Sequence, residues 1–251
     1  MSEQDYNNMG PNASRFFSGT VSDSDVIDRL FNQSASLFAD VIRKSTTEYD
    51  SVIALLDIGS YKGEFATSII SMIKDKSFVI TAVDSNSTVL AENKIALFKV
   101  EAPAYALPLL DKTYDVSIMR YVLHWNSWEN QKKILSEAIR VTKGIFIVQH
   151  LGSDVVDNFE WNKRMQEVVG GIVPKLYRPD AYFSSSNEIE EYVKEFPVSV
   201  VRLQNRRIEK PSIGYQKRFD LSDSDFRRVQ EILGDKDYIM QTTWLISRKE
   251  D

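Results

Sequence analysis

Only two histidines occur in the 251 residues, His124 and His150. A neutral imidazole takes a proton readily from a hydroxyl or an amine near pH 7. Each histidine lies at or just past the end of a short apolar run that predicts a strand, and open α/β sheets bind ligands at the carboxyl ends of their strands. We predict His150 as a general base and His124 as a second candidate, with a structural hydrogen-bonding role as the alternative for each.

An acid and two glycines share the stretch LLDIGSYKGEFA, residues 55–66. An apolar run ends at Ile58 and a helix is predicted from about Lys62, which leaves Gly59 to Gly63 as the crossover. Backbone N–H groups at such a helix start can approach a ligand closely. The two glycines are four positions apart, whereas the outer glycines of the dinucleotide fingerprint G-x-G-x-x-G are five apart.

A second acid, Asp84, ends the next apolar run 21 residues after Gly63. In a doubly wound nucleotide-binding sheet, an acid at this place accepts hydrogen bonds from ribose hydroxyls. The alternative role for Asp84 is to cap a helix that begins near Asn86, and the two roles are compatible.

Aromatic side chains gather in two segments that are expected to lie above the same sheet edge. They favour a planar or apolar ligand, although aromatic residues more often belong to the core. The predicted pocket residues are Trp125, Trp128, Phe159, Trp161, Tyr177 and Tyr182.

Alternating strands and helices must position these residues. Short apolar runs predict strands at 52–58, 78–83, 96–100, 114–119, 145–149, 198–203 and 238–246, and amphipathic stretches predict helices at 62–74 and 128–141. Ser22, Ser185 and Ser222 are predicted to begin further helices, the last of them ending near Leu233. Strands that are apolar on both faces and alternate with helices imply a parallel sheet covered on both sides.

Composition excludes several classes of protein. The absence of cysteine excludes disulfides, thiolate nucleophiles and cysteine-based metal sites, and we expect no metal. The net charge of −5 provides no positive field to attract nucleic acid or anionic lipid. No run of about 18 apolar residues predicts a membrane span, so we expect a soluble, cytoplasmic protein that binds neither nucleic acid nor membrane.

Three segments resemble the class I S-adenosylmethionine-dependent methyltransferases. Asp57, Gly59 and Gly63 match the first motif of that family, D/E-x-G-x-G-x-G, in which Tyr61 replaces the middle glycine. The segments ALPLLDKTYDVSIMRYVLHW (106–125) and SEAIRVTKGIFIVQH (136–150) are similar to the family's fourth strand and to the helix and fifth strand that follow it. With Asp84 in place, the resemblance covers about residues 50 to 150.

The resemblance implies a Rossmann-like doubly wound sheet, mostly parallel with an antiparallel C-terminal strand and with helices on both faces. It implies S-adenosyl-L-methionine as the methyl donor. The methionine end would lie at Asp57, Gly59, Tyr61 and Gly63, the ribose at Asp84 and the adenine near Ala104. Arg120 and Tyr121 would lie beside the methionine moiety, although a surface salt bridge is the alternative role for Arg120.

One position departs from the family pattern. Many members carry an acid just before the L-P pair that accepts the adenine amino group, and Pro103 stands there in this chain. Either Glu101 or backbone groups near Ala104 take over that role, or the nucleotide is bound more loosely.

The predicted organisation is a mobile arm at 1–19 followed by one methyltransferase domain at 20–251. Within it we distinguish an N-terminal lid helix (20–50), a donor-binding half (51–150), a lid insertion (151–195) and C-terminal strands and helix (196–251). The expected reaction is methylation of an oxygen or nitrogen of a small, aromatic or apolar molecule. The alternatives are methylation of a protein or carrier-bound acyl group, favoured by the basic residues of 202–218, and a non-methylating protein of the same fold. Homodimerisation stays open.

Overall fold

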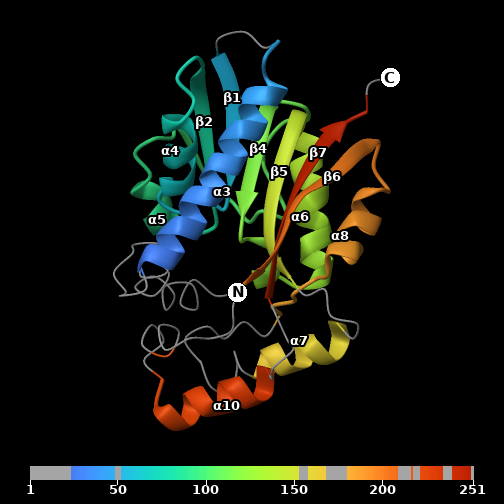
Figure 1. Cartoon of the computed structure of the whole chain (residues 1–251). Helices are drawn as coiled ribbons and strands as arrows, with labels where there is room; N and C mark the ends of the chain where they lie inside the picture. The colour runs from blue at the N-terminus through green and yellow to red at the C-terminus, as the bar shows by residue number, and fades with distance from the viewer. Residues whose placement is uncertain are drawn as a thin grey trace.

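The computed structural model describes residues 24–48, 52–152, 158–167, 180–208, 216, 221–233 and 239–249 (Figure 1). Its helices are α3 (Ser24–Ser45), α4 (Glu64–Ser71), α5 (Ser87–Ala91), α6 (Trp128–Val141), α7 (Asn158–Glu167), α8 (Ser186–Val193) and α10 (Asp223–Leu233), with a short 3-10 helix η1 (Leu123–Trp125). Its strands are β1 (Val52–Ile58), β2 (Ser77–Asp84), β3 (Phe98–Glu101), β4 (Tyr114–Arg120), β5 (Thr142–Gly152), β6 (Val198–Ile208) and β7 (Ile239–Arg248). The predicted arm at 1–19 lies outside the described residues.

The strands form one sheet in the order β3-β2-β1-β4-β5-β7-β6. The first five strands pair in parallel, and β7 runs antiparallel to both β5 and β6. The predicted doubly wound sheet with an antiparallel C-terminal strand is therefore confirmed. Strands β5 and β6 extend beyond the carboxyl ends of their apolar runs because β7 provides hydrogen-bonding partners along the additional length.

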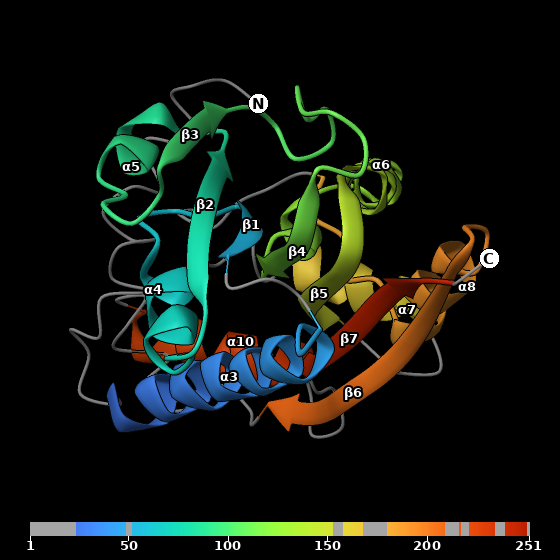
Figure 2. The ribbon, with the colours of Figure 1, turned by 90° about the horizontal axis from the view of Figure 1, so that it is seen from above.

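Helices cover both faces of the sheet (Figures 1 and 2). On one face, Phe38 and Ile42 of α3 and Ile69 of α4 are buried against β1 and β4. On the other face, α6 and α8 bury Leu135 and Ile189 in a second apolar cluster. Helix α8 begins at the predicted position, because Ser185 and Glu188 form a reciprocal capping box.

The carboxyl ends of the parallel strands share one edge, which lies at the bottom of the sheet in Figure 1. Helices α7 and α10 lie below that edge, and α3 crosses the sheet with its N-terminal end directed toward it. The use of α3 and of the 151–195 insertion as lids stays a prediction. None of the described helices is long and apolar enough to cross a membrane.

Candidate functional site

In the crossover from β1 to α4, every second residue from Gly59 to Gly63 has a backbone in the left-handed region of φ. Gly59, Tyr61 and Gly63 have φ values of 70°, 50° and 83°. These three residues occupy the glycine positions of the motif, so the backbone keeps the motif's conformation although a side chain stands in the middle. The amide groups of Gly59 and Ser60 both donate to the carbonyl of Val83, which ties the turn to β2.

Both glycines are required by close neighbours as well as by φ. A Cβ atom on Gly59 would lie 2.3 Å from Cγ2 of Val122, and one on Gly63 would lie 2.7 Å from the side-chain amide of Asn93. The turn is thus a narrow cradle in which the backbone itself is the surface open to a ligand.

Tyr61 connects the turn to the end of β2. Its backbone N–H donates to Oδ2 of Asp84 over 2.9 Å, and the N–H of Asn86 donates to the other oxygen, Oδ1, over 3.0 Å. Asp84 does not cap α5, because the side chain of Asn86 accepts the N–H groups of Thr88 and Val89. Asp84 instead fixes the turn after β1 relative to the turn after β2.

Two carboxylates meet beneath this turn. Asp57 and Asp84 are both buried, with exposed fractions of 4% and 5%. Burial, together with the negative charges of Asp84 and Glu64, raises the pKa of Asp57 to about 7. Oδ2 of Asp57 has no hydrogen-bonding partner among the described residues, so this carboxyl suits a positively charged group.

The exit of β4 places Arg120 and Tyr121 beside the turn. The Arg120 guanidinium carbon lies 4.1 Å from the ring centre of Tyr121 and 4.9 Å from that of Phe65. Its Nε donates to Gln149 over 3.1 Å, and burial lowers its pKa. Arg120 is therefore no surface salt bridge. Tyr121, with φ of 60°, donates its hydroxyl to Gln241 over 2.6 Å.

His150 is buried and holds a neighbouring segment. Its Nε2 lies 3.0 Å from Oγ of Ser184 and 3.2 Å from the carbonyl oxygen of the same residue. Gln131 donates through Nε2 to the carbonyls of Asn126 and Tyr182, so its Oε1 must accept the Ser184 hydroxyl. Ser184 Oγ can then only accept from His150, and Nε2 of His150 carries the proton.

His124 is also buried, with 2% of its surface exposed, but it is differently engaged. Its ring stacks on Phe183 at 5.4 Å and lies 5.8 Å from the ring of His150. Burial and the neighbouring His150 hold the pKa of His124 well below its usual value, so the ring is neutral at pH 7. Nδ1 of His124 has no hydrogen-bonding partner in the described part of the chain.

The predicted pocket aromatics fall into two groups. Trp125 lies 4.7 Å from the ring of His124, close to the candidate site. Trp128 contacts Tyr182 and Tyr192, and Tyr182 donates its hydroxyl to Glu188, so this pair anchors α8. The backbones of Phe159 and Trp161 lie in α7, but their side chains, and all of Tyr177, lie outside the described residues.

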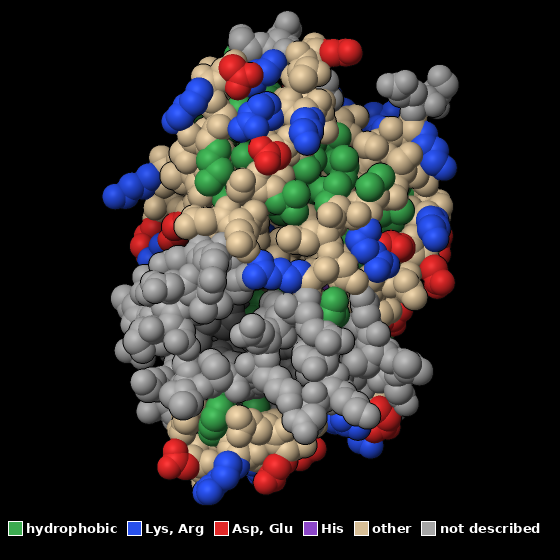
Figure 3. All heavy atoms as spheres, in the orientation of Figure 1, with side chains coloured by type: hydrophobic (Ala, Val, Ile, Leu, Met, Phe, Trp, Pro, Cys, Tyr) green, Lys and Arg blue, Asp and Glu red, His purple; other side chains and the backbone are tan. Residues whose placement is uncertain are grey.

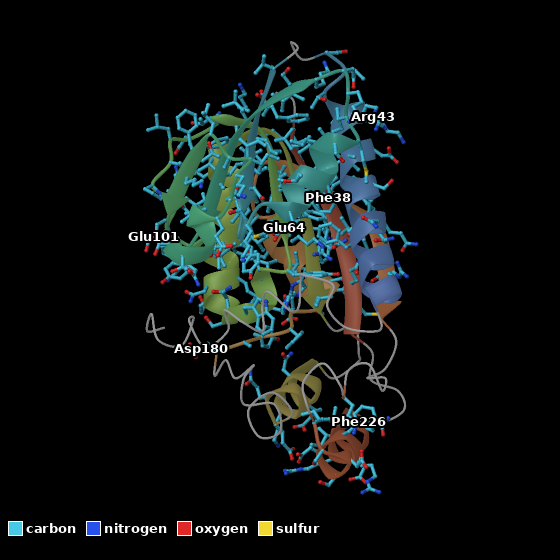
Figure 4. All side chains as sticks on the ribbon, turned by 90° about the vertical axis from the view of Figure 1, so that its left-hand side faces the viewer. Phe38, Arg43, Glu64, Glu101, Asp180 and Phe226 are labelled. Atoms are coloured by element: carbon cyan, nitrogen blue, oxygen red, sulfur yellow. The ribbon has the colours of Figure 1, made fainter. Side chains whose placement is uncertain are left out.

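The predicted adenine side follows β3. Ala104 is half-buried, and Glu101 is exposed at the outer margin of the sheet (Figure 4). The sequence did not reveal the interactions of Arg140 that hold the loop after β3. Arg140 donates to both carboxylate oxygens of Glu137 and to the carbonyls of Leu107 and Leu109. The signal was present as the E-x-x-R pattern, which places the two side chains one helical turn apart.

Comparison with known proteins identifies the donor-binding half of the chain. Residues 56–148 match the family model described as a methyltransferase domain. This segment is a methyltransferase domain. The matched range contains the cradle, both buried carboxylates and the exit of β4. No curated protein matches the sequence.

Solved structures share the fold of this chain at low sequence identity. The YcgJ protein from Bacillus subtilis is 15% identical, with a TM-score of 0.67 over 87% of this chain and 99% of that one. The [4+2]-cyclase SpnF is 14% identical, with a TM-score of 0.60 over 98% and 95%. Magnesium protoporphyrin IX methyltransferase from Synechocystis PCC 6803, solved with bound S-adenosylhomocysteine, is 11% identical, with a TM-score of 0.55 over 87% and 83%.

Proposed function

We propose that this methyltransferase moves a methyl group to an oxygen or nitrogen of a small, aromatic or apolar molecule. The observation that carries the proposal is the cradle of Gly59, Tyr61 and Gly63 above the buried Asp57, with Asp84 beside it. Aromatic side chains around His124 supply the apolar surroundings on the acceptor side.

The residues present fit the donor. S-adenosylmethionine supplies a methyl group on a positively charged sulfur, which a nucleophile displaces in line. The unpartnered oxygen of Asp57 suits the ammonium group of the donor's methionine end, and a cradle without Cβ atoms at Gly59 and Gly63 admits that end. Asp84 would accept the ribose hydroxyls, and the backbone near Ala104 would receive the adenine.

The geometry favours His124 over His150 as the group that accepts the acceptor's proton. Nε2 of His150 is hydrogen-bonded to Ser184, so His150 is a positioning residue for the segment at 182–185. His124 is neutral, lies in η1 shortly after β4 and makes no hydrogen bond among the described residues. Removal of a proton from a hydroxyl or amine acceptor requires such a neutral base.

The basic run at 202–218 supports the protein-methylating alternative weakly. Arg202 is neutralised by Glu190 over 2.7 Å, and Arg206 donates to Gln33. Acidic and basic side chains are mixed over the described part of the face shown in Figure 3, which offers no field of one sign to a macromolecule. The other basic side chains of the run lie outside the described residues.

Two measurements test the proposal. Calorimetry with S-adenosylhomocysteine should show binding, and its absence would favour a protein that keeps the fold without methylating. A screen of small-molecule acceptors with labelled S-adenosylmethionine should then find transfer to a hydroxyl or amine of an aromatic or apolar compound. Transfer only to proteins or acyl carriers would refute the small-molecule assignment.

A further inference from the structure

Arg120 differs from two other partly buried arginines of the described chain. Arg140 is neutralised by Glu137 and Asp111, and Arg202 is neutralised by Glu190. Arg120 pairs with no carboxylate in the described part of the chain. A guanidinium that has lost much of its solvation and has no counter-ion is costly to keep unless a ligand supplies the counter-charge.

Three aromatic rings surround its guanidinium. The guanidinium carbon lies 4.1 Å from the ring centre of Tyr121, 4.9 Å from that of Phe65 and 5.2 Å from that of Phe31. These rings come from the exit of β4, from α4 and from α3, so three separate elements converge on one side chain. Aromatic faces stabilise the cation while leaving the N–H donors along its edge to other partners.

A neighbouring amide fixes the orientation of the guanidinium. Arg120 donates through Nε to Oε1 of Gln149, and Gln149 donates through Nε2 to Thr243 over 2.9 Å. Because Gln149 is fully buried and held at both ends, it sets the direction in which the two terminal nitrogens of Arg120 point. This arrangement pre-organises a planar fork that matches the two oxygens of a carboxylate.

The fork lies beside the donor cradle. The β1–β4 ladder pairs Ile58 with Met119, so Arg120 is level with Gly59 at the carboxyl edge of the sheet. Phe65, which contacts the guanidinium, is in the first turn of α4. Asp57, on the neighbouring strand, is buried, and no ion pair joins it to Arg120 among the described residues. The edge therefore presents an acidic and a basic group that are not paired with each other.

We propose that Arg120 is the recognition residue of a carboxylate-binding site at this edge of the sheet. The inference deepens the proposed function and rests on it. The carboxylate has two chemically equivalent sources. It belongs either to the amino-acid end of the donor or to an acceptor that carries its own carboxylate.

The test compares wild type with Arg120→Met, which keeps the length of the side chain but removes its charge. S-adenosylhomocysteine carries a carboxylate, whereas 5′-methylthioadenosine has the same nucleoside without the amino acid. If the donor supplies the carboxylate, calorimetry should show a loss of about 10- to 100-fold in affinity for the first compound and no change for the second.

If the acceptor supplies it, both nucleosides should bind the variant normally. Ligand-detected NMR should then show benzoate binding to wild type, with and without S-adenosylhomocysteine, but not to Arg120→Met. The neutral analogue benzamide should not distinguish wild type from Arg120→Met. Arg120→Lys keeps the charge without the fork and should fall between wild type and Arg120→Met in the affected arm; it also serves if Arg120→Met does not fold. Arg43→Met, at the other end of α3, should change nothing.

Unaltered binding of all four compounds to a folded Arg120→Met would overturn the carboxylate site while leaving the proposed function intact. Failure of wild type to bind either nucleoside would instead remove the proposed function, and the benzoate arm without nucleoside would still decide the role of Arg120.

Discussion

The backbone N–H of Tyr61 and the carboxylate of Asp84 are joined by a hydrogen bond of 2.9 Å. This bond connects the middle of the turn after β1 to the last residue of β2. It explains how a tyrosine is retained where the family motif has a glycine. The left-handed conformation costs about 1–2 kcal/mol for a residue with a side chain, and the hydrogen bond to a charged partner contributes a similar amount in return.

Asp84→Asn should open this connection. Both carboxylate oxygens accept a backbone N–H, from Tyr61 and from Asn86, so an amide would turn its NH₂ group toward one of these donors. We expect S-adenosylhomocysteine affinity to fall at least about tenfold and the free energy of unfolding to fall by about 1–2 kcal/mol. Calorimetry and urea unfolding measure the two effects.

Glu101→Gln is the matched control for that change. Glu101 pairs with Asp84 in the β2–β3 register but is exposed. The control should bind S-adenosylhomocysteine like wild type if backbone groups near Ala104 receive the adenine. A loss equal to that of Asp84→Asn would show that Glu101 moves in to bind the nucleoside.

Asp57 should make both stability and donor binding depend on pH. Its folded-state pKa of about 7 exceeds its unfolded value of 3.8, so it contributes to stability below about pH 4 and loses that contribution as the pH rises through 7. Asp57→Asn should therefore raise the thermal midpoint of the ligand-free protein at pH 8 more than at pH 5. The ionised carboxylate is the form that attracts the ammonium group, which S-adenosylhomocysteine shares with the donor, so wild-type affinity for S-adenosylhomocysteine should increase from pH 6 to pH 8.

In Asp57→Asn the affinity should be weak and independent of pH over the same range. Glu64→Gln provides a graded control, because the charge of Glu64 contributes to the raised pKa of Asp57. Its pH midpoint for binding should move below that of wild type. A flat wild-type profile, or a wild-type midpoint that stays unchanged in Glu64→Gln, would refute the assignment of Asp57.

Gly59→Ala should be partly rescued by a second substitution. The new Cβ meets Cγ2 of Val122 at 2.3 Å, and φ of 70° adds a strain of about 1–2 kcal/mol. Val122→Ala removes the clash but not the strain. Gly59→Ala should therefore cost less stability in a Val122→Ala background, by about 1 kcal/mol or more in a double-mutant cycle measured by urea unfolding. Simple additivity would mean that the neighbouring segment moves freely away from the turn.

Local patterns predicted the elements well where each element depends on its own residues. The strand at 52–58 and the helix at 128–141 have the predicted bounds, since an apolar run and the Ser127 cap define them. The lengths of β5 and β6 depend on β7, which is distant in sequence, so no local pattern contains them. The cradle was identified from the positions of Gly59 and Gly63, because glycine at a strand–helix crossover has a direct conformational meaning.

The roles of individual polar side chains were less predictable, because their partners are non-local. The position of His150 at a strand end correctly placed it near the carboxyl edge. Nothing in the sequence pairs it with Ser184, which lies 34 residues further along the chain. The three rings around Arg120 likewise come from α3, α4 and β4. Only the tertiary structure shows that Nε2 of His150 is held by Ser184, whereas His124 makes ring contacts alone within the described part of the chain.

Substitution of each histidine by phenylalanine should separate their roles. His124→Phe keeps a ring against Phe183 and Trp125, so stability and S-adenosylhomocysteine affinity should stay close to wild type while transfer to an identified acceptor falls at least about 100-fold. His150→Phe leaves Ser184 without its donor, so amide exchange at 182–185 should accelerate. If His150→Phe instead abolishes transfer with exchange unchanged, His150 is the base that the sequence predicted.

Arg140→Lys should loosen the adenine side of the site without touching the cradle. Arginine at this position uses its whole fork, donating to Glu137 and to the carbonyls of Leu107 and Leu109. Lysine keeps the charge but cannot reach these acceptors together, so the free energy of unfolding should fall by about 2 kcal/mol. Because Glu137 also accepts the N–H of Leu107, the loop after β3 should exchange its amides faster, and the affinity for S-adenosylhomocysteine should fall several-fold.

Arg43→Lys, whose ion pair with Asp40 is exposed, provides the control and should leave both the stability and the affinity unchanged. Equal effects of the two substitutions would show that Arg140 contributes no more to stability than a surface ion pair does. The loop after β3 would then be held by its apolar contacts alone.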